Sequence, residues 1–196
     1  MKKKTVAVMM AALMAMGMVS AVSVQAGIED KTLIVGFDAE YPPYGYMDEN
    51  GEYTGFDLEL AQAVCDLEGW ELEKKPISWD SKDQELDAGS IDCIWNGFTM
   101  NGREDDYTFS MPYVDNSQVI VVAEDSGIEA LTDLAGKTVG VQAASAALDL
   151  LQSEEEGGQK ELADTFAALN QFADYNTAFT ELQAGALDAL AIDVGV

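Results

Sequence analysis

The sequence predicts an α/β protein of two similar lobes with a ligand cleft between them. Apolar segments rich in β-branched residues alternate with segments of helical period, which is typical of parallel βαβ units. The same order of segments restarts in the second half of the 196-residue chain. A hydrophobic fraction of 48% is enough to fill packed cores and argues against a disordered protein.

Residues 1–26 are expected to be a secretory signal peptide. Lysines at 2–4 precede an apolar run of about 14 residues, and Val-Gln-Ala at 24–26 matches the small-x-Ala pattern of a cleavage site. The alternative is a membrane anchor, but the run is shorter than the ~20 residues that span a bilayer. No cysteine lies near the site. We therefore expect a secreted protein, periplasmic or outside the cell envelope, without a lipid anchor.

Residues 27–117 are expected to form the first lobe. Asp57 can cap a helix that runs to Glu68, since its carboxylate can accept from free N–H groups at the helix start, and Gly69 suits the helix end. The other expected elements are a strand at 32–36, a loop at 38–47, a turn at Asn50-Gly51, a strand at 70–74, a helix at 81–88 and a strand at 91–95.

Residues 118–196 are expected to form the second lobe, which begins with a hinge strand at 118–123. This strand is a nearly unbroken run of Val and Ile, so we expect it to be buried on both faces. The other expected elements are a strand at 137–142, a helix at 145–152, a charged loop at 153–160, a helix at 177–184 and a strand at 187–192.

Two internal echoes support a pair of similar lobes. Residues 85–92 read ELDAGSID and residues 181–188 read ELQAGALD, in each case a helix end, a glycine and a strand opened by Asp. Lys31-Thr32 with Gly36 recurs as Lys137-Thr138 with Gly140. The alternative is a coincidence, because helix-ending glycines and strand-opening residues are common in α/β proteins. Two α/β lobes in one chain form a cleft, and ligands bind there at the carboxyl ends of strands.

The composition excludes several classes of function. A formal net charge of −26 argues against a nucleic-acid partner and against binding to a membrane through basic residues. The chain has no His and two Cys, which excludes His-based catalytic triads, His-ligated metals and a zinc cage, so we expect no cofactor. In an exported protein Cys65 and Cys93 could form a disulfide; the alternative is two buried free thiols.

Chemically complementary residues follow the carboxyl ends of the expected strands. Arg103 is the only Arg in the chain and suits a carboxylate, as do the hydroxyl and the N–H groups at Ser145, while Asp193 can accept from an ammonium group. Each residue alone has an ordinary explanation, such as a surface ion pair, a cap or loop packing. Their joint placement favours a site for a zwitterion, formed by Asp38, Tyr41, Trp79, Gly97, Thr99, Arg103, Ser145 and Asp193.

Several segments together resemble the family 3 extracellular solute-binding proteins, which serve ABC-type amino-acid importers. The segments are VGFDAEYPPY at 35–44, GFDLELA at 55–61, IDCIWNGFT at 91–99, Arg103, FSMPY at 109–113 and GVQA at 140–143. The resemblance covers 32–193 and implies a type II periplasmic-binding-protein fold that closes on a ligand. It also implies that the protein captures a free, polar amino acid as a monomer and delivers it to the membrane subunits of an ABC importer.

The resemblance implies a role for each candidate residue. Arg103 and Ser145 would hold the α-carboxylate, and Asp193 would hold the α-ammonium with help from Gly97 and Thr99. Tyr41 and Trp79 would sandwich the ligand, and Asp38 would meet a polar side chain. This sequence departs from the pattern at two places: the segment 97–103 is one residue shorter than usual, and Ala144 stands where many relatives have Gly, which tolerates more conformations.

Two other functions remain open at this point. Some relatives of this fold are cyclohexadienyl or arogenate dehydratases, which need a general acid such as Asp38 or Glu40, although nothing singles these residues out. A ligand-sensing domain of a receptor would need a following transmembrane segment. We expect a binding protein and no enzyme. Because relatives usually need more residues to complete the second lobe and return to the first, we also expect the second lobe and the return segment to be incomplete.

Overall fold

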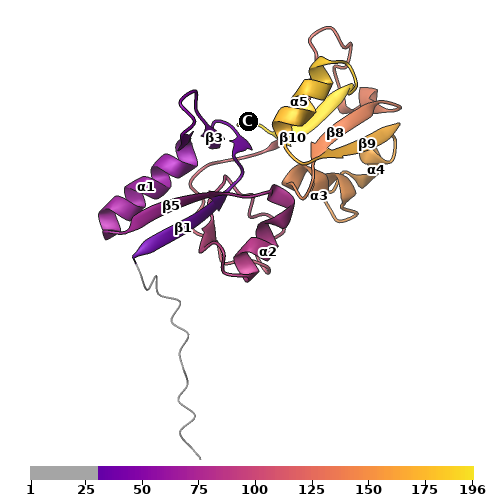
Figure 1. The fold of residues 1–196 in the computed structure, drawn as a ribbon. Coiled ribbons are helices and arrows are strands. Elements are labelled where there is room, and N and C mark those ends of the chain that lie inside the picture. The colour runs from indigo at the N-terminus through magenta and orange to yellow at the C-terminus, as the bar shows by residue number, and fades with distance from the viewer. Residues whose placement is uncertain (1–30) are drawn as a thin grey trace, which may run out of the picture. The chain divides into compact units, whose positions relative to one another are not determined.

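The computed structural model describes residues 31–196, and the expected signal peptide lies outside these residues. The first sheet has the order β5-β1-β6, and all of its strands are parallel. It is formed by β1 (Thr32–Phe37), β5 (Glu71–Pro76) and the short β6 (Cys93–Ile94), and its connections contain α1 (Phe56–Glu68), η1 (Trp79–Ser81) and α2 (Lys82–Asp87) (Figure 1). The expected strands and helices of this part are confirmed, with shifted ends.

The segment expected to be a loop at 38–47 contributes to a small antiparallel sheet. This sheet has the order β2-β3-β4 and is formed by β2 (Glu40–Tyr41), β3 (Gly45–Met47) and β4 (Tyr53–Thr54). The expected turn at Asn50-Gly51 joins the last two strands, and the Asp48 carboxylate accepts there from the N–H of Asn50 at 2.8 Å. Strands this short carry too few residues to display the period of two by which a strand is recognised.

The prediction that Asp57 caps helix α1 is wrong. The residue before the helix is Gly55, and the N–H groups of Phe56 and Asp57 donate to the carbonyls of Pro43 and Tyr44, both at 3.0 Å. The loop therefore satisfies the start of the helix, and the Asp57 side chain is free to lie in the interior with 0% exposure. At the other end Gly69 is left-handed, as expected.

The second sheet has the order β7-β10-β8-β9, with β7 antiparallel and the other strands parallel. Its strands are β7 (Gln118–Val122), β8 (Thr138–Gln142), β9 (Ala168–Phe172) and β10 (Ala189–Asp193). Between them lie η2 (Leu131–Leu134), α3 (Ala146–Gln152), α4 (Lys160–Ala163) and α5 (Tyr175–Gln183). Strand β9 and helix α4 are additional to the expected elements. The expectation that 118–123 is buried on both faces is wrong: β7 is an edge strand, and all its residues are half-buried.

The longer internal echo corresponds to a repeated structural unit. Asp92 exchanges two backbone and side-chain hydrogen bonds with Ile34 of β1, both at 2.8 Å, and Asp188 exchanges the same pair with Thr138 of β8 at 2.8 and 2.9 Å. A Cβ atom on Gly36 would lie 2.5 Å from Ile91, and one on Gly140 would lie 2.5 Å from Leu187. These contacts align Ile34 with Thr138 and Gly36 with Gly140. The Lys31-Thr32 and Lys137-Thr138 pairs of the shorter echo are therefore offset by two residues in the structure.

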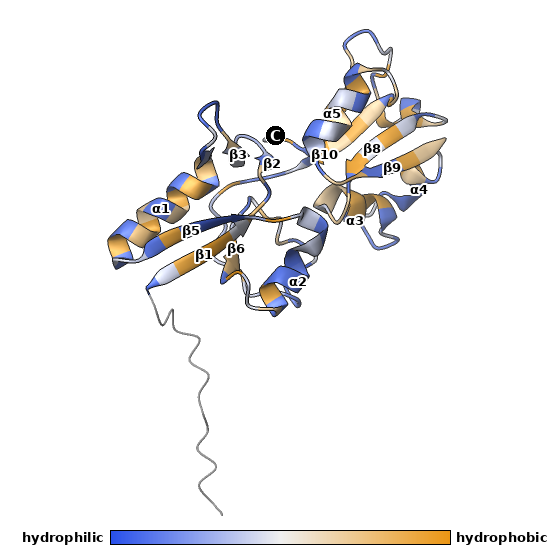
Figure 2. Cartoon of the chain, in the orientation of Figure 1, coloured by the Kyte–Doolittle hydropathy of each residue, from blue (hydrophilic) through white to orange (hydrophobic). Residues whose placement is uncertain are grey.

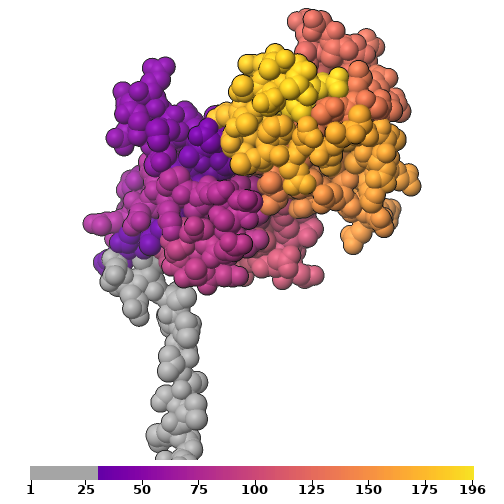
Figure 3. Space-filling view, turned by 45° about the vertical axis from the view of Figure 1, so that its right-hand side comes forward, coloured from indigo at the N-terminus to yellow at the C-terminus, as the bar shows by residue number. Residues whose placement is uncertain are grey.

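Two apolar clusters cover the faces of the second sheet. One cluster joins α3 to β8 and β10 and includes Val141, Leu148 and Leu151. The other joins α5 to β10 and includes Tyr175 and Leu190, together with Tyr41 from β2. Figure 2 shows the apolar residues concentrated on β1, β8 and β10, while β5 is mostly polar. In Figure 3 the residues around β2 lie against the C-terminal residues in yellow, which agrees with contacts between β2 and α5.

Within residues 31–196, no helix combines the length and the apolar composition that crossing a membrane requires.

Candidate functional site

A narrow pocket lies where the carboxyl ends of strands from both sheets meet. Its lining includes every residue proposed from the sequence except Asp38, namely Tyr41, Trp79, Gly97, Thr99, Arg103, Ser145 and Asp193, and it also includes Asn96, Phe98, Gln142 and Ala146. The cavity volume is about 10 Å³, room for about one water molecule. The pocket must therefore open to admit any larger ligand.

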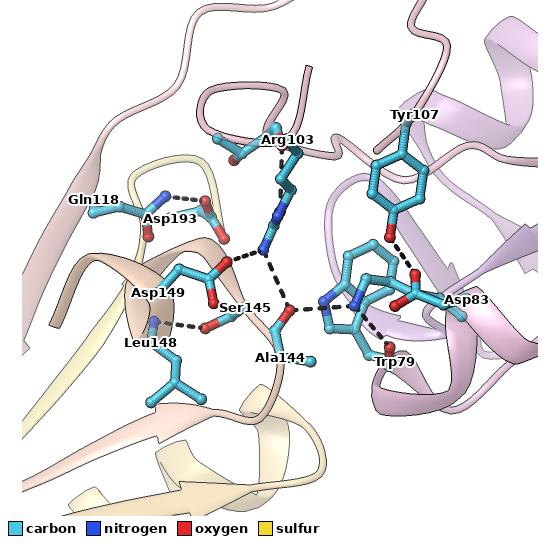
Figure 4. Close-up of polar contacts among 12 residues, drawn as sticks. Trp79, Asp83, Arg103, Tyr107, Gln118, Ala144, Ser145, Leu148, Asp149 and Asp193 are labelled. Atoms are coloured by element: carbon cyan, nitrogen blue, oxygen red, sulfur yellow. Dashed lines mark hydrogen bonds and ion pairs between the residues drawn. The ribbon is translucent and has the colours of Figure 1, made fainter. Parts of the chain in front are cut away.

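Arg103 forms the positively charged end of the pocket. Its Nη2 donates to Asp149 Oδ2 at 2.6 Å and to the Ala144 carbonyl at 3.5 Å, and its Nη1 donates to the Thr99 carbonyl at 3.3 Å. The guanidinium carbon lies 4.8 Å from the centre of the Phe98 ring. Figure 4 shows Arg103 reaching toward Asp149 and Ala144. The Asp149 carboxylate thus accepts from the same Arg103 N–H group that a ligand carboxylate would use.

Ser145 lies beside Arg103 at the start of α3. Its Oγ accepts from the Leu148 N–H at 3.2 Å, so it acts as the N-cap of this helix, and its hydroxyl hydrogen can still donate into the pocket. The preceding Ala144 has a φ of 54°, in the left-handed region. This conformation is accessible to Gly at little cost and costs Ala about 1 kcal/mol. The Ala144 carbonyl thereby points toward Arg103.

Asp193 forms the negatively charged end of the pocket. It is the last residue of β10 and is 6% exposed. Its Oδ1 accepts from the side-chain amides of Asn116 and Gln118, the latter at 2.6 Å, and Asn116 also donates to Thr99 Oγ1 at 3.3 Å. These two amides fix the carboxylate, and the sequence pattern did not identify them.

Asp38 lies behind Gln142 and outside the pocket lining. Its Oδ2 accepts from Gln142 Nε2 at 2.6 Å, and its Oδ1 accepts from the Glu40 N–H at 2.9 Å. Burial raises the pKa of Asp38. The Gln142 Nε2 also donates to the Ala173 carbonyl at 3.2 Å, so both amide hydrogens are engaged. Gln142 is the polar last residue of β8 and follows the buried Val139 and Val141, so the strand-end pattern that identified Asp193 could also have identified it.

The aromatic walls belong to different packing environments. Trp79 is 6% exposed and meets the Phe98 ring edge-on, with 5.4 Å between ring centres. Tyr41 is 5% exposed and lies 6.0 Å from the ring of Tyr175, inside the apolar cluster of α5 and β10. Burial raises the pKa of Tyr41, and the nearby Asp193 raises it further.

Gly97 joins the pocket to a buried carboxyl group. It is left-handed with a φ of 47°, and its N–H donates to the Tyr113 hydroxyl at 3.3 Å. The same hydroxyl donates to Asp57 Oδ1 at 2.8 Å. The other oxygen of Asp57 is buried without a hydrogen-bond partner, and burial raises the pKa of Asp57 to about 6.

The structure describes both cysteines as free thiols. Cys65 is buried on α1 and Cys93 is half-buried on β6. Burial raises the pKa of Cys93 to about 11. Among residues 31–196, no group of three or more acidic or thiol side chains is arranged to hold a metal ion.

Comparison with known proteins identifies relatives that are named as amino-acid-binding proteins. The L-cystine-binding protein TcyJ of Escherichia coli strain K12 is 32% identical over 168 residues, which are 84% of this chain and 60% of TcyJ. The arginine-binding extracellular protein ArtP of Bacillus subtilis strain 168 is 36% identical over 146 residues, which are 73% of this chain and 57% of ArtP. The chain thus spans 60% or less of the length of these two relatives.

Solved structures and a family model agree with these relatives. An ABC uptake transporter substrate-binding protein from Streptococcus pneumoniae, solved with bound histidine, is 36% identical and superposes with a TM-score of 0.78 over 84% of this chain and 67% of that protein. The two-lobed α/β fold is therefore the type II periplasmic-binding-protein fold. The model of the bacterial extracellular solute-binding proteins, family 3, matches residues 33–193, and the chain belongs to this family.

Proposed function

We propose that the protein captures a free amino acid in the pocket between its lobes and presents it to an ABC importer. The observation that carries this proposal is the pairing of a cationic end at Arg103 with an anionic end at Asp193 in one pocket. These two ends suit the carboxylate and the ammonium group of an α-amino acid. In this proposal residues 27–117 and 118–196 are the two lobes that open and close around the ligand.

The remaining contacts define what the ligand would meet. The Ser145 hydroxyl would donate to the ligand carboxylate, while Gly97 and Thr99 would assist Asp193 at the ammonium group. Tyr41 and Trp79 would flank the side chain. Because Gln142 stands between Asp38 and the pocket, we assign the contact with a polar ligand side chain to Gln142, and Asp38 would hold the Gln142 amide in place.

The proposed partners and location rest on the relatives. TcyJ and ArtP are named as binding proteins for cystine and arginine, and the pneumococcal structure holds histidine. Membership of an extracellular family supports export, for which residues 1–26 would be the signal peptide. The membrane subunits of an ABC importer would receive the amino acid from the closed, monomeric protein.

A ligand screen tests this function directly. The protein is purified, unfolded, dialysed and refolded to remove any ligand that copurifies, and then titrated calorimetrically with the standard amino acids and with L-cystine. We expect at least one amino acid to bind without being consumed. Binding of none of them would refute the proposal, and conversion of a cyclohexadienyl acid to product would favour the dehydratase alternative.

The substitution Arg103→Ala tests the assignment of the carboxylate end. Removing one partner of a desolvated ion pair costs about 2–5 kcal/mol. The dissociation constant of the amino acid found in the screen should therefore rise by roughly 30-fold to several thousand-fold. Lys160→Met is the control, because Lys160 is a partly exposed cation that pairs with Asp164 at 2.7 Å and does not line the pocket. An unchanged affinity in Arg103→Ala would remove Arg103 from the site.

A further inference from the structure

Lys82 is a buried cation that the functional assignment above does not use. It begins helix α2 and is 4% exposed. Its Nζ donates to the carbonyls of Ala144 at 3.4 Å and of Trp79 at 3.5 Å, both long for hydrogen bonds of a charged donor. It also lies 5.1 Å from the centre of the Trp79 ring. Among residues 31–196, no carboxylate lies within 4 Å of this ammonium group.

Lys82 and Arg103 converge on one acceptor. The Ala144 carbonyl accepts from Lys82 Nζ at 3.4 Å and from Arg103 Nη2 at 3.5 Å, so the two cations are no more than about 7 Å apart. Burial lowers the pKa of Lys82, and the neighbouring Arg103 lowers it further, while the carboxylates of Asp83, Asp149 and Asp80 oppose this effect. A buried ammonium group with weak partners is costly, which indicates that a partner is missing.

The charge balance at this end of the pocket identifies the kind of partner. Asp149 lies 2.6 Å from Arg103 Nη2 and compensates the guanidinium, although this carboxylate is itself 60% exposed. Two cations face one close carboxylate, so one positive charge is left without a close counterion. A ligand carboxylate beside Ser145 would complete the balance. Trp79 is both a wall of the pocket and the ring under the Lys82 ammonium, which places the charge directly behind the pocket lining.

We propose that Lys82 is a specificity-determining residue of the ligand site, whose charge, beside the Arg103–Asp149 pair, selects for a carboxylate on the ligand. This inference rests on the proposed function, since it deepens the role of the same pocket. The competing explanation is that Lys82 only supports the rings of Trp79 and Phe98. The two explanations differ in one measurable respect: a supporting role is indifferent to the charge of the ligand.

The test compares amino acids with their uncharged α-carboxamides. The probe is the tightest binder among L-cystine, L-arginine, L-histidine and L-glutamine. Its affinity and the affinity of its α-carboxamide are both measured by calorimetry on the refolded protein. Lys82→Met keeps the aliphatic stem and removes the charge. We expect it to weaken binding of the acid by roughly 10- to 100-fold and to lower the acid-to-amide preference by a similar factor. Lys160→Met should leave this preference unchanged.

Asp149→Asn provides a second arm that leaves Lys82 intact. It frees Arg103 Nη2 from its internal carboxylate, so we expect tighter binding of the acid but not of the amide. Combined with Lys82→Met, it should restore much of the lost affinity for the acid. An acid-to-amide preference that is unchanged in Lys82→Met overturns the inference. If Lys82→Met does not fold, equal effects of Asp149→Asn on acid and amide overturn it instead. Failure of the refolded wild-type protein to bind any amino acid would refute the proposed function first.

Discussion

The buried carboxyl group of Asp57 should make the stability of this protein fall as the pH rises. Its side chain is 0% exposed, one oxygen accepts from Tyr113 at 2.8 Å, and the other has no partner. Burial disfavours the ionised form and raises the pKa from an ordinary value of 3.8 to about 6. Between these values the folded protein binds more protons than the unfolded chain. This stabilisation is therefore complete below a pH of about 4 and is lost as the pH rises through about 6.

The substitution Asp57→Asn removes this dependence while keeping the shape of the side chain. A rise in pKa from 3.8 to about 6 corresponds to about 3 kcal/mol, because each pKa unit is worth about 1.4 kcal/mol. Relative to the wild type, the variant should gain about 3 kcal/mol of unfolding free energy between about pH 4 and about pH 7.5. Taking the difference between two pH values cancels the packing effects of the substitution that do not depend on pH.

Urea unfolding followed by circular dichroism at both pH values measures this quantity. Asp66→Asn is the matched control, since Asp66 lies on the same helix, is exposed and bonds only to Gln62 among the described side chains. A change of less than about 1 kcal/mol in Asp57→Asn, within the spread typical of single interactions, would refute the assignment of a raised pKa to this group.

Other consequences of the structure can be checked by simpler measurements. Asp92→Ala and Asp188→Ala should each lower the unfolding free energy by about 1 kcal/mol, since each removes the acceptor of a strand N–H at 2.8 Å, and the double variant should show the sum in urea titrations. Gly140→Ala should cost about 1–3 kcal/mol in the same assay, because its Cβ would lie 2.5 Å from Leu187 Cδ1, and a neutral result would contradict this tight approach. In the native protein the Cys93 thiol should react slowly with maleimide near neutral pH, because burial raises its pKa to about 11; two labels per chain should appear after unfolding without reductant, and the absence of label would indicate a disulfide.

The positions of the main pocket residues were predictable because they follow a rule of topology. Parallel strands bring their carboxyl ends to one edge of a sheet, so polar residues directly after strands are expected to meet, however far apart they lie in the sequence. Thr99, Ser145 and Asp193 follow or end such strands and line one pocket. Recognising this required only the strand ends and the residue types.

The partners of individual side chains were not predictable, since they come from distant segments. The sequence pattern gives Asp57 the form of a helix cap, but its partner Tyr113 lies 56 residues further along the chain. The family resemblance implies that Asp38 meets a ligand side chain, and in the structure its carboxylate accepts from Gln142, which lies 104 residues away and lines the pocket. The local sequence shows that a carboxylate can accept hydrogen bonds. It does not show which donor the tertiary packing brings to that carboxylate.

The edge strands of the second sheet show a different limit of prediction from sequence. Strand β7 has the apolar run of a central strand but lies at an edge, where its residues are half-buried. Strand β9 lies at the opposite edge and contains exposed Asn170 and Gln171, so it lacks the apolar run by which a buried strand is recognised. Apolar content therefore predicted that β7 is a strand, but it did not predict the place of that strand in the sheet.

The burial of Tyr41 against the second sheet has a thermodynamic consequence. Its ring packs with Tyr175 and the apolar side chains of α5 and β10, although it belongs to β2 of the small antiparallel sheet. If the protein opens and closes around its ligand as proposed, this contact separates on opening and both faces become hydrated. Exposure of apolar surface raises the heat capacity of a protein. The heat-capacity change of ligand binding should therefore be more negative than the surface of one amino acid accounts for, because closing the lobes dehydrates Tyr41 as well.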